Sequence, residues 1–279
     1  MFGKTFGKYF SLIALILMVL IAVMQIFVPL STNKVFATSQ SAFAVLDGDT
    51  FTLLCQSNCH AKLPMASTTK IMTALLALEN KKTDEKVTVT KEMTGIEGSS
   101  VYLKEGEILT IKELLYCLML RSGNDSAVAL AIAVSGSIDG FASMMNERAE
   151  SMNLLNTHFV NPHGLHDDNH YTSAYDLAYI AAIAMKNPVF RDIVSTKKIT
   201  VGEGESQRYL LNKNKMLLSY DGANGIKTGY TKKSGRCLVS SATKNGRTLI
   251  CVVLNYGDTY GLSKQLLDKG FDMIQSPNA

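Results

Sequence analysis

The order of strand-like and helix-like segments constrains the fold of this chain more than any other feature of its sequence. Two strand-like stretches, SAFAVLD and FTLLC, flank an Asp47-Gly48-Asp49 turn and predict a β-hairpin. Helical patterns fill the middle of the chain, and three more strand-like stretches follow: GIKTGYT, RCLVSSAT and RTLICVVLNY. A last amphipathic stretch, LSKQLLDKGFDMI, predicts a terminal helix. Because strands and helices do not alternate, we expect an α+β fold: an antiparallel sheet built from both ends of the chain, with the helices between forming a second lobe.

Several residues mark where the central helices begin or end. Thr110 and Glu113 have the spacing of a capping box, in which each side chain accepts a hydrogen bond from the other residue's backbone N–H. The predicted helices run from Ser67 to about Glu79, from Thr110 to the Ser122-Gly123-Asn124 turn, from Asp125 through SAVALAIAV, from Asp139 to about Met152, and over TSAYDLAYIAAIAMKN, where Thr172 is the expected N-cap. A cleft between the two lobes is the expected place for a ligand site.

The N-terminal segment predicts export. Lys4 and Lys8 precede the uncharged stretch FSLIALILMVLIAVMQIFVPL, and small Ala37 stands where a signal peptidase would cut. The apolar stretch is also long enough for a membrane span, which takes about 20 residues. We therefore expect residues 1–37 to be a signal peptide or an N-terminal membrane anchor, with membrane attachment through residues 10–30 in the second case. A core helix is disfavoured, because a helix that is apolar on every face needs lipid or a very large core around it.

Charge and cysteine content exclude two classes of protein. Three of the four excess positive charges fall on Lys4, Lys8 and Lys34, so the rest of the chain is nearly neutral and no nucleic-acid partner is expected. Five cysteines, an odd number, do not form a disulfide framework.

Individual cysteine pairs can also be assessed from the sequence. Cys55 and Cys59 are close enough to bridge in an oxidising compartment, and their spacing fits a plain loop equally well. An Asn245-Gly246 hairpin turn places Cys251 opposite Ser240 and puts Cys237 on the other face of the sheet, so these two cysteines should not bond.

The stretch MASTTK at residues 65–70 is the first chemical motif. On a helix, residues three apart lie on one face, so the amine of Lys70 can reach the hydroxyl of Ser67. The spacing alone decides little, because it recurs at Ser31/Lys34, Ser195/Lys198 and Ser241/Lys244.

Three motifs in order are far more specific than one. Ser67-Thr68-Thr69-Lys70 at a helix start is followed by Ser122-Gly123-Asn124 between helices and by Lys227-Thr228-Gly229 on a late strand, and the last triplet occurs nowhere else in the chain. Together they match the S-x-x-K, S-D-N and K-T-G set of penicillin-binding proteins and class A β-lactamases.

Longer stretches carry a resemblance to one family. LPMASTTKIMTALLALE, LRSGNDSAVALA, NPHGLHDDNHYTSAYDLAYIA and GANGIKTGYTKKSG resemble the serine-type D-alanyl-D-alanine carboxypeptidases, which are low-molecular-weight penicillin-binding proteins. The resemblance runs from about Ala42 to Ile274. It implies a five-stranded antiparallel sheet flanked by helices, with a helical lobe, as in the fold shared by β-lactamases and penicillin-binding transpeptidases.

The same resemblance implies a division of the chain. Residues 38–279 are expected to form the catalytic domain, with a sheet lobe at about 40–66 and 200–275 and a helical lobe at about 67–199. The C-terminal β-rich domain that the family often adds is expected to be absent, since the chain ends after the final catalytic-domain helix. The enzyme is expected on the extracytoplasmic face of the bacterial membrane or secreted to the cell wall.

A mechanism and a set of residue roles follow from the resemblance. Ser67 would attack the carbonyl between two D-alanines of a peptidoglycan stem peptide and form an acyl-enzyme. Lys70 would accept its proton, which requires a neutral amine, and burial together with the nearby Lys227 would lower the pKa of Lys70. The remaining roles are oxyanion binding by the backbone N–H groups of Ser67 and Tyr230, proton relay by Ser122, substrate-amide binding by Asn124, carboxylate binding by Lys227 and Thr228, and close backbone approach at Gly229. β-Lactam antibiotics would acylate the same serine, and neither a metal nor another cofactor is expected.

Three alternatives remain open from the sequence. His163, His166 and His170 with Asp167 and Asp168 form a dense patch that resembles a zinc site, although zinc needs three converging ligands. A β-lactamase uses the same three motifs, but class A enzymes add a glutamate that activates water, and neither Glu147 nor Glu150 stands in the required E-x-x-L-N setting. A penicillin-sensing domain would keep acylation and lose turnover of peptides.

Overall fold

A computed structural model describes residues 41–275. The predicted signal peptide or membrane anchor, and the candidate attachment through residues 10–30, lie outside the described residues.

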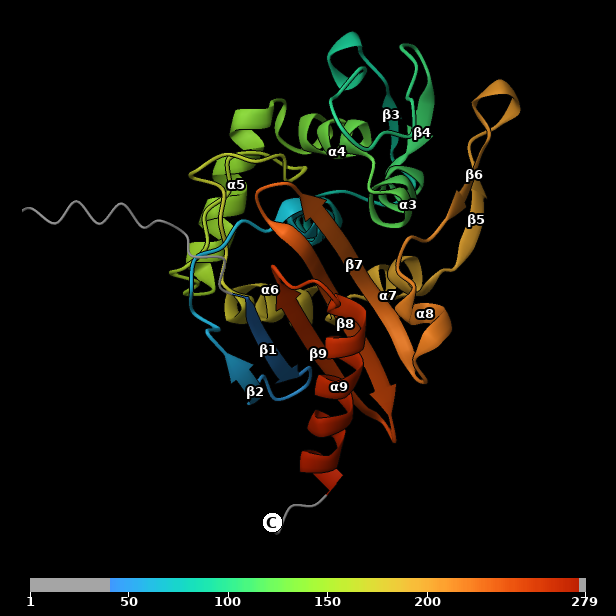
Figure 1. Cartoon of the computed structure of the whole chain (residues 1–279). Helices are drawn as coiled ribbons and strands as arrows, with labels where there is room; N and C mark the ends of the chain where they lie inside the picture. The colour runs from blue at the N-terminus through green and yellow to red at the C-terminus, as the bar shows by residue number, and fades with distance from the viewer. Residues whose placement is uncertain (1–40, 276–279) are drawn as a thin grey trace, which may run out of the picture. The chain divides into compact units, whose positions relative to one another are not determined.

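The centre of the described chain is a five-stranded antiparallel sheet in the order β2-β1-β9-β8-β7 (Figure 1). Its strands are β1 (Ala42–Asp47), β2 (Leu53–Ser57), β7 (Ala223–Thr231), β8 (Gly235–Lys244) and β9 (Arg247–Leu254). The first described strand, β1, pairs with β9, the last described strand in sequence, as the order of segments predicts. The α+β class and the five-stranded sheet are confirmed, and β7 forms one edge of the sheet.

Strand register explains why the cysteines stay apart. The Asn245-Gly246 turn pairs Lys244 with Arg247 and Ser240 with Cys251, as predicted. Both turn residues have positive φ, at +50° and +75°, which is the geometry that a two-residue hairpin needs. Cys237 and Cys251 pack into different apolar clusters. All five cysteines lie within residues 41–275 and are free thiols, including Cys55 and Cys59.

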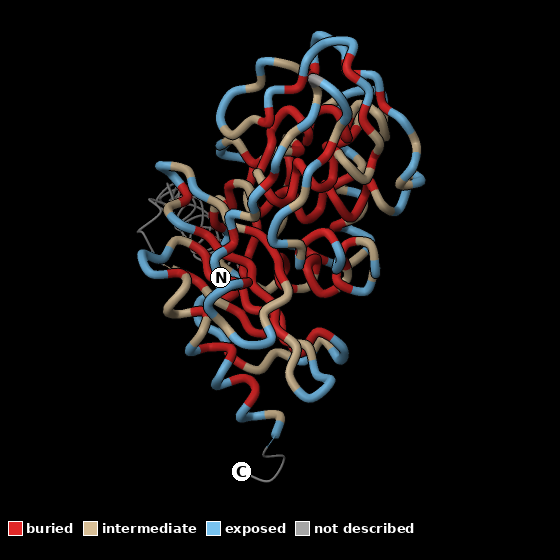
Figure 2. Tube along the Cα trace, turned by 90° about the vertical axis from the view of Figure 1, so that its right-hand side faces the viewer, coloured by how far each residue is buried: buried red, intermediate tan, exposed pale blue. Residues whose placement is uncertain are grey.

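Helices cover both faces of the sheet. The helices of the described residues are α2 (Lys70–Asn80), α3 (Ile111–Arg121), α4 (Asn124–Ser135), α5 (Ile138–Ser151), α6 (Ala174–Lys186), α7 (Pro188–Ser195), α8 (Met216–Ser219) and α9 (Thr259–Gln275). Helix α9 contacts β8 and β9 on one face, while α6 contacts β1 and β9 and belongs to the larger core on the other. Figure 2 shows the buried residues running through the middle of these elements, with exposed residues in the loops around them.

Two small two-stranded antiparallel sheets extend from the helical region (Figure 1). They are β3 (Lys86–Thr88) with β4 (Ile108–Thr110), and β5 (Lys198–Val201) with β6 (Arg208–Leu211). An ion pair between Arg208 and the buried carboxylate of Glu107, next to β4, joins the two small sheets. The β5–β6 hairpin and helix α7 were not predicted, because all three elements are short: α7 has eight residues and each strand has four.

Helix caps confirm one prediction and correct two. Thr110 and Glu113 form the capping box, with both reciprocal hydrogen bonds present. The N-cap of α6 is Ser173 rather than Thr172: the Ser173 hydroxyl accepts the Asp176 N–H, whereas Thr172 is extended and pairs with Leu63.

The second correction concerns the start of α4. This helix begins at Asn124, one residue before the predicted Asp125. The Asp125 carboxylate accepts hydrogen bonds from the backbone N–H groups of Val101 and Leu103 instead of opening the helix.

Membrane-spanning potential within residues 41–275 is limited to one bent pair. No single described helix has the length and apolar character to cross a membrane, and α4 with α5 meets the criteria only as a pair bent by 81°.

Candidate active site

Ser67 lies in a 3-10 turn, η1 (Ala66–Thr69), that leads directly into α2. Ala66 enters this turn at a φ of +48°, a left-handed conformation that residues other than glycine rarely adopt. Two buried hydroxyls hold the turn: Thr68 Oγ1 donates to the Met65 carbonyl at 2.6 Å, and Thr69 Oγ1 donates to the Ala66 carbonyl at 2.8 Å. The two threonines between the serine and the lysine therefore fix the backbone that presents Ser67.

The amine of Lys70 is fully buried and contacts three neutral groups. Its Nζ lies 3.1 Å from Ser67 Oγ, 2.7 Å from Asn124 Oδ1 and 2.5 Å from the His163 carbonyl oxygen. Burial, followed by the charges of Lys227 and Lys213, holds the pKa of Lys70 well below its ordinary value, and Asp125 opposes the shift. A neutral amine has two N–H groups and one lone pair. It can therefore donate to Asn124 and His163 while its lone pair faces the Ser67 hydroxyl.

The Ser122-Gly123-Asn124 turn joins α3 to α4 and supplies the second wall. Asn124 donates from Nδ2 to the Glu97 carbonyl at 2.5 Å, which orients its Oδ1 toward Lys70. Ser122 is buried in a left-handed conformation with a φ of +66°, and its hydroxyl has no hydrogen-bond partner among the described residues. The structure thus joins Ser67, Lys70 and Asn124 directly, and leaves the Ser122 hydroxyl unpaired.

Strand β7 brings Lys227-Thr228-Gly229 against the nucleophile turn. A Cβ at Gly229 would lie 3.1 Å from the Met65 carbonyl oxygen and 3.2 Å from the Ser67 backbone nitrogen, so a side chain there would push β7 away from η1. Lys227 is buried, donates to the Thr228 carbonyl at 2.9 Å, and has its pKa lowered to about 7 by burial and by Lys213.

Two hollows meet at this strand. One, of about 340 Å³, is lined by Ser67 and Asn124 together with Gly98, Ser99, His163, Gly164, Leu165, Tyr230 and Thr231. The other, of about 320 Å³, is lined by Thr228, Gly229, Tyr230, Arg236, Cys237, Thr259 and Tyr260. Tyr230, which is 65% exposed, contributes to both, so an extended ligand can lie along β7 past Ser67.

The loop at residues 161–165 completes the site, and sequence reasoning did not assign it a role. The Asn161 side chain accepts the backbone N–H groups of His163 and Gly164, which folds the loop so that the His163 carbonyl faces Lys70. The sequence carries two signals here, a Pro- and Gly-containing run before the Thr172 region and the resemblance of the stretch NPHGLHDDNHYTSAYDLAYIA to the serine-type family. A backbone acceptor leaves no side-chain signature, so the contact to Lys70 could not have been foreseen.

The histidines near this loop have separate partners. His170 is buried, with Nε2 at 2.7 Å from Thr69 Oγ1 and Nδ1 accepting the Val160 N–H, and burial lowers its pKa to about 3. His166 pairs with Asp168 at 3.3 Å. Among residues 41–275, no group of three or more His, Cys, Asp or Glu side chains is arranged to hold a metal ion.

Gly164 is expected to be indispensable to this arrangement. It has a φ of +87°, and a Cβ there would lie 2.0 Å from the Ala66 carbonyl oxygen. Gly164→Ala should lower the melting temperature and slow acylation of Ser67, because relief of the clash moves the loop that holds Lys70. Gly106→Ala is the matched control, since Gly106 has a φ of +81° with nothing within 4 Å of the added Cβ. The control should show only the backbone strain, about 1–2 kcal/mol; equal losses in both variants would contradict the role of the clash.

Comparison with known proteins places these features in a family. A model of the D-alanyl-D-alanine carboxypeptidase family, peptidase S11, matches residues 30–258. The chain belongs to peptidase family S11. The resemblance found in the sequence is thereby confirmed.

Several S11 relatives are similar over most of this chain. The D-alanyl-D-alanine carboxypeptidase DacF of Bacillus subtilis is 36% identical over 228 residues, which cover 80% of this chain and 58% of the relative. A D-alanyl-D-alanine carboxypeptidase of Streptomyces sp. strain K15 is 37% identical over 227 residues, which cover 75% of this chain and 78% of that protein. This chain thus spans little more than half the length of the Bacillus relative.

A crystal structure shows the same fold. The Streptomyces K15 DD-transpeptidase superposes with a TM-score of 0.79 at 33% identity, covering 82% of this chain and 96% of that one. The fold that the resemblance implies, that of β-lactamases and penicillin-binding transpeptidases, is confirmed by this similarity.

Proposed function

We propose that the chain is a serine-type D-alanyl-D-alanine carboxypeptidase that removes the terminal D-alanine from peptidoglycan stem pentapeptides and is acylated by penicillin. The observation that carries this proposal is the fully buried Lys70, whose Nζ lies 3.1 Å from Ser67 Oγ beside the K-T-G strand. Membership of the S11 family supports it.

Acylation begins with transfer of the Ser67 hydroxyl proton to the neutral Nζ of Lys70. The Ser67 oxygen bonds to the carbonyl carbon between the two D-alanines, and the oxyanion accepts hydrogen bonds from the backbone N–H groups of Ser67 and Tyr230. The C–N bond then breaks, the leaving amine takes the proton from Lys70 through the Ser122 hydroxyl, and D-alanine departs. Water then attacks the ester carbonyl, a proton of that water passes through Lys70 to the Ser67 oxygen as the ester C–O bond breaks, and the shortened peptide leaves with its new carboxyl group.

Substrate binding uses the remaining motif residues. Asn124 holds the substrate amide, and Lys227 with Thr228 receives the terminal carboxylate. Because its pKa is lowered to about 7, Lys227 is only partly charged near neutral pH before substrate binds. An approaching carboxylate favours the charged form, so substrate binding and protonation of Lys227 reinforce each other.

The lining of the cleft argues against efficient penicillin turnover. No acidic side chain of the described residues lines the hollow that contains Ser67. Glu147 and Glu150 lie exposed on α5 and do not reach it. We therefore favour a carboxypeptidase over a β-lactamase, whose class A members use a glutamate to activate the deacylating water.

Incubation with pentapeptide-bearing peptidoglycan fragments tests the proposal. Release of free D-alanine with a tetrapeptide product is the expected result, together with a penicilloyl-enzyme that outlives the acyl-peptide intermediate. A penicillin-sensing domain would bind penicillin and release no D-alanine. Comparable deacylation of both acyl groups would instead favour a β-lactamase.

The pH dependence should separate the two buried lysines. For a peptide with a free carboxylate, kcat/KM should rise with pH as Lys70 loses its proton and fall above about pH 7 as Lys227 loses its charge. The same peptide with a C-terminal carboxamide should show the rising limb alone, since it does not need the charge on Lys227. Initial rates for both peptides across pH 5–10 check this; identical profiles would contradict the role of Lys227.

We also propose that the enzyme acts outside the cytoplasm, where peptidoglycan is found. The lysine-flanked apolar N-terminal stretch supports export. Release after Ala37 and retention through residues 10–30 are both compatible with that location.

A further inference from the structure

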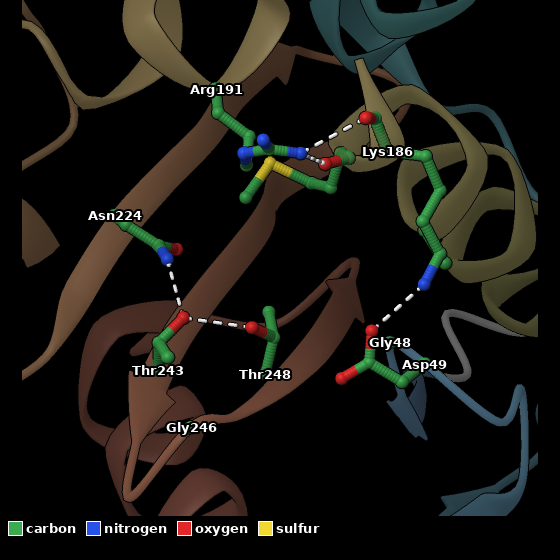
Figure 3. A pocket seen from close by; sticks show the side chains of 10 residues that line it. Gly48, Asp49, Lys186, Arg191, Asn224, Thr243, Gly246 and Thr248 are labelled. Carbon is green, nitrogen blue, oxygen red and sulfur yellow. Dashed lines mark hydrogen bonds and ion pairs between the residues drawn. The ribbon is translucent and has the colours of Figure 1, made fainter. Parts of the chain in front are cut away.

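A third hollow lies at the far end of β7 from the K-T-G motif. Its volume is about 420 Å³, and it is bounded by the β1–β2 turn, the end of α6, the start of α7 and the ends of β7, β8 and β9 (Figure 3). Asn224 lines it near the start of β7, whereas Tyr230 lines the hollows near Ser67 at the end of that strand. We call it the Arg191 pocket, after one of the two cations that line it.

Arg191 lines the pocket with an exposed side chain, and most of its hydrogen-bond donors have no partner among the described residues. Its Nη1 donates to the Met185 and Lys186 carbonyl oxygens at 2.7 and 3.0 Å, at the C-terminus of α6 (Figure 3). A guanidinium has five N–H groups, so three remain on Nε and Nη2. Arg191 forms no ion pair within residues 41–275, which leaves its charge uncompensated by any described carboxylate.

A pair of threonines adds one more donor. Thr243 Oγ1 accepts a hydrogen bond from Asn224 Nδ2, and the Thr243 and Thr248 hydroxyls lie 2.8 Å apart (Figure 3). One of these hydroxyls donates to the other, whichever way round the bond runs. The two hydroxyls together carry two protons, and their mutual hydrogen bond uses one of them. The other proton is free to be donated to a ligand.

The other charges of the pocket cancel. Lys186 Nζ pairs with Asp49 Oδ1 at 2.8 Å on the opposite side from Asn224 (Figure 3). Both side chains are about half exposed, so this pair can exchange with water. The pocket as a whole therefore carries one net positive charge and offers mainly donors.

We propose that the Arg191 pocket binds a small anion, through a carboxylate or a phosphoryl group held by Arg191 and the threonine pair. A charged acceptor matches donors that the protein itself leaves unpaired, and a planar guanidinium suits both anions. The volume lies within the range of small-molecule sites, about 300–1,000 Å³. This site does not depend on the proposed peptidase activity.

Ligand-observed NMR on the full chain in detergent tests the site with two probes, acetate and methylphosphonate. Each carries methyl protons that report binding, and their relative affinities identify a carboxylate or a phosphoryl ligand. Arg191→Gln should weaken binding about tenfold or more, as expected for loss of a charge-assisted hydrogen bond. Asp49→Asn should strengthen binding about two- to fivefold, because it frees Lys186 from an exposed ion pair.

Matched controls separate the pocket from general surface charge. Lys91→Gln and Asp84→Asn make the same charge changes at exposed positions elsewhere and should leave both affinities unchanged. Binding should also survive acylation of Ser67 by penicillin. The proposal is overturned if neither probe binds, if penicillin abolishes binding, or if the controls shift affinity as much as the pocket variants do. Should Arg191→Gln fail to fold, the exposed Asp49→Asn variant still decides the outcome.

Discussion

Replacing Ser67 by alanine is expected to abolish covalent labelling by a fluorescent penicillin while leaving the fold intact. The oxygen that would form the ester is removed, and no other serine of the described chain lies within hydrogen-bond distance of Lys70 Nζ. Lys70 keeps its contacts to Asn124 and the His163 carbonyl, so the cost in stability should be small. Gel fluorescence after incubation with the labelled penicillin measures the loss, and the melting temperature checks the fold.

Ser99→Ala is the matched control for that experiment. Ser99 lines the same hollow, and its hydroxyl accepts only a long hydrogen bond from Lys213 at 3.4 Å. This variant should be labelled normally. Labelling that persists in Ser67→Ala, or that moves to Ser122, would refute Ser67 as the nucleophile.

The two buried lysines should respond differently to the same substitution. Lys70→Arg should lose acylation by several orders of magnitude, since arginine cannot be deprotonated in a protein and so cannot accept the Ser67 proton. It also places a larger group in a site where Lys70 has no exposed surface. Lys227→Arg keeps a positive charge for the substrate carboxylate and should retain measurable activity. Rates of penicillin acylation for both variants provide the measurement.

Differences in packing must be separated from differences in chemistry. Lys227 is also buried, so the two arginines face comparable steric cost, and melting temperatures of both variants show whether they fold equally well. If both folded variants lose acylation to the same extent, the assignment of a base to Lys70 and a charge to Lys227 is wrong.

Much of the fold was predictable from interactions between residues close together in the sequence. The strands and the Asn245-Gly246 hairpin followed from alternation and from a turn that needs two positive φ angles. The capping box at Thr110 followed from hydrogen bonds between residues three apart. The α6 cap was misplaced because Thr172 and Ser173 are equally suited to that role, and only the pairing of Thr172 with Leu63 decides between them.

The candidate site was predictable only where side chains carry it. The contact between Ser67 and Lys70 follows from helical spacing. The contact of Lys70 with the His163 carbonyl and the close approach of Gly164 to Ala66 involve backbone atoms that tertiary structure brings together. Residue types alone do not predict such contacts. Likewise, the donors of the Arg191 pocket come from α7 and from two strands, β8 and β9, whose approach to α7 only the tertiary structure creates.

The contacts of Lys70 also make the site a reporter of folding. Its amine joins Asn124 and His163, which lie 54 and 93 residues further along the chain, and β7 must close against η1 from a still greater distance. Contacts that close such long loops form late in folding, because the entropy of loop closure is lost before they stabilise the chain. A chain with native helices but an undocked β7 would leave Lys70 hydrated and protonated, and therefore unreactive. Penicillin labelling during refolding would then time the last step of tertiary assembly rather than the appearance of secondary structure.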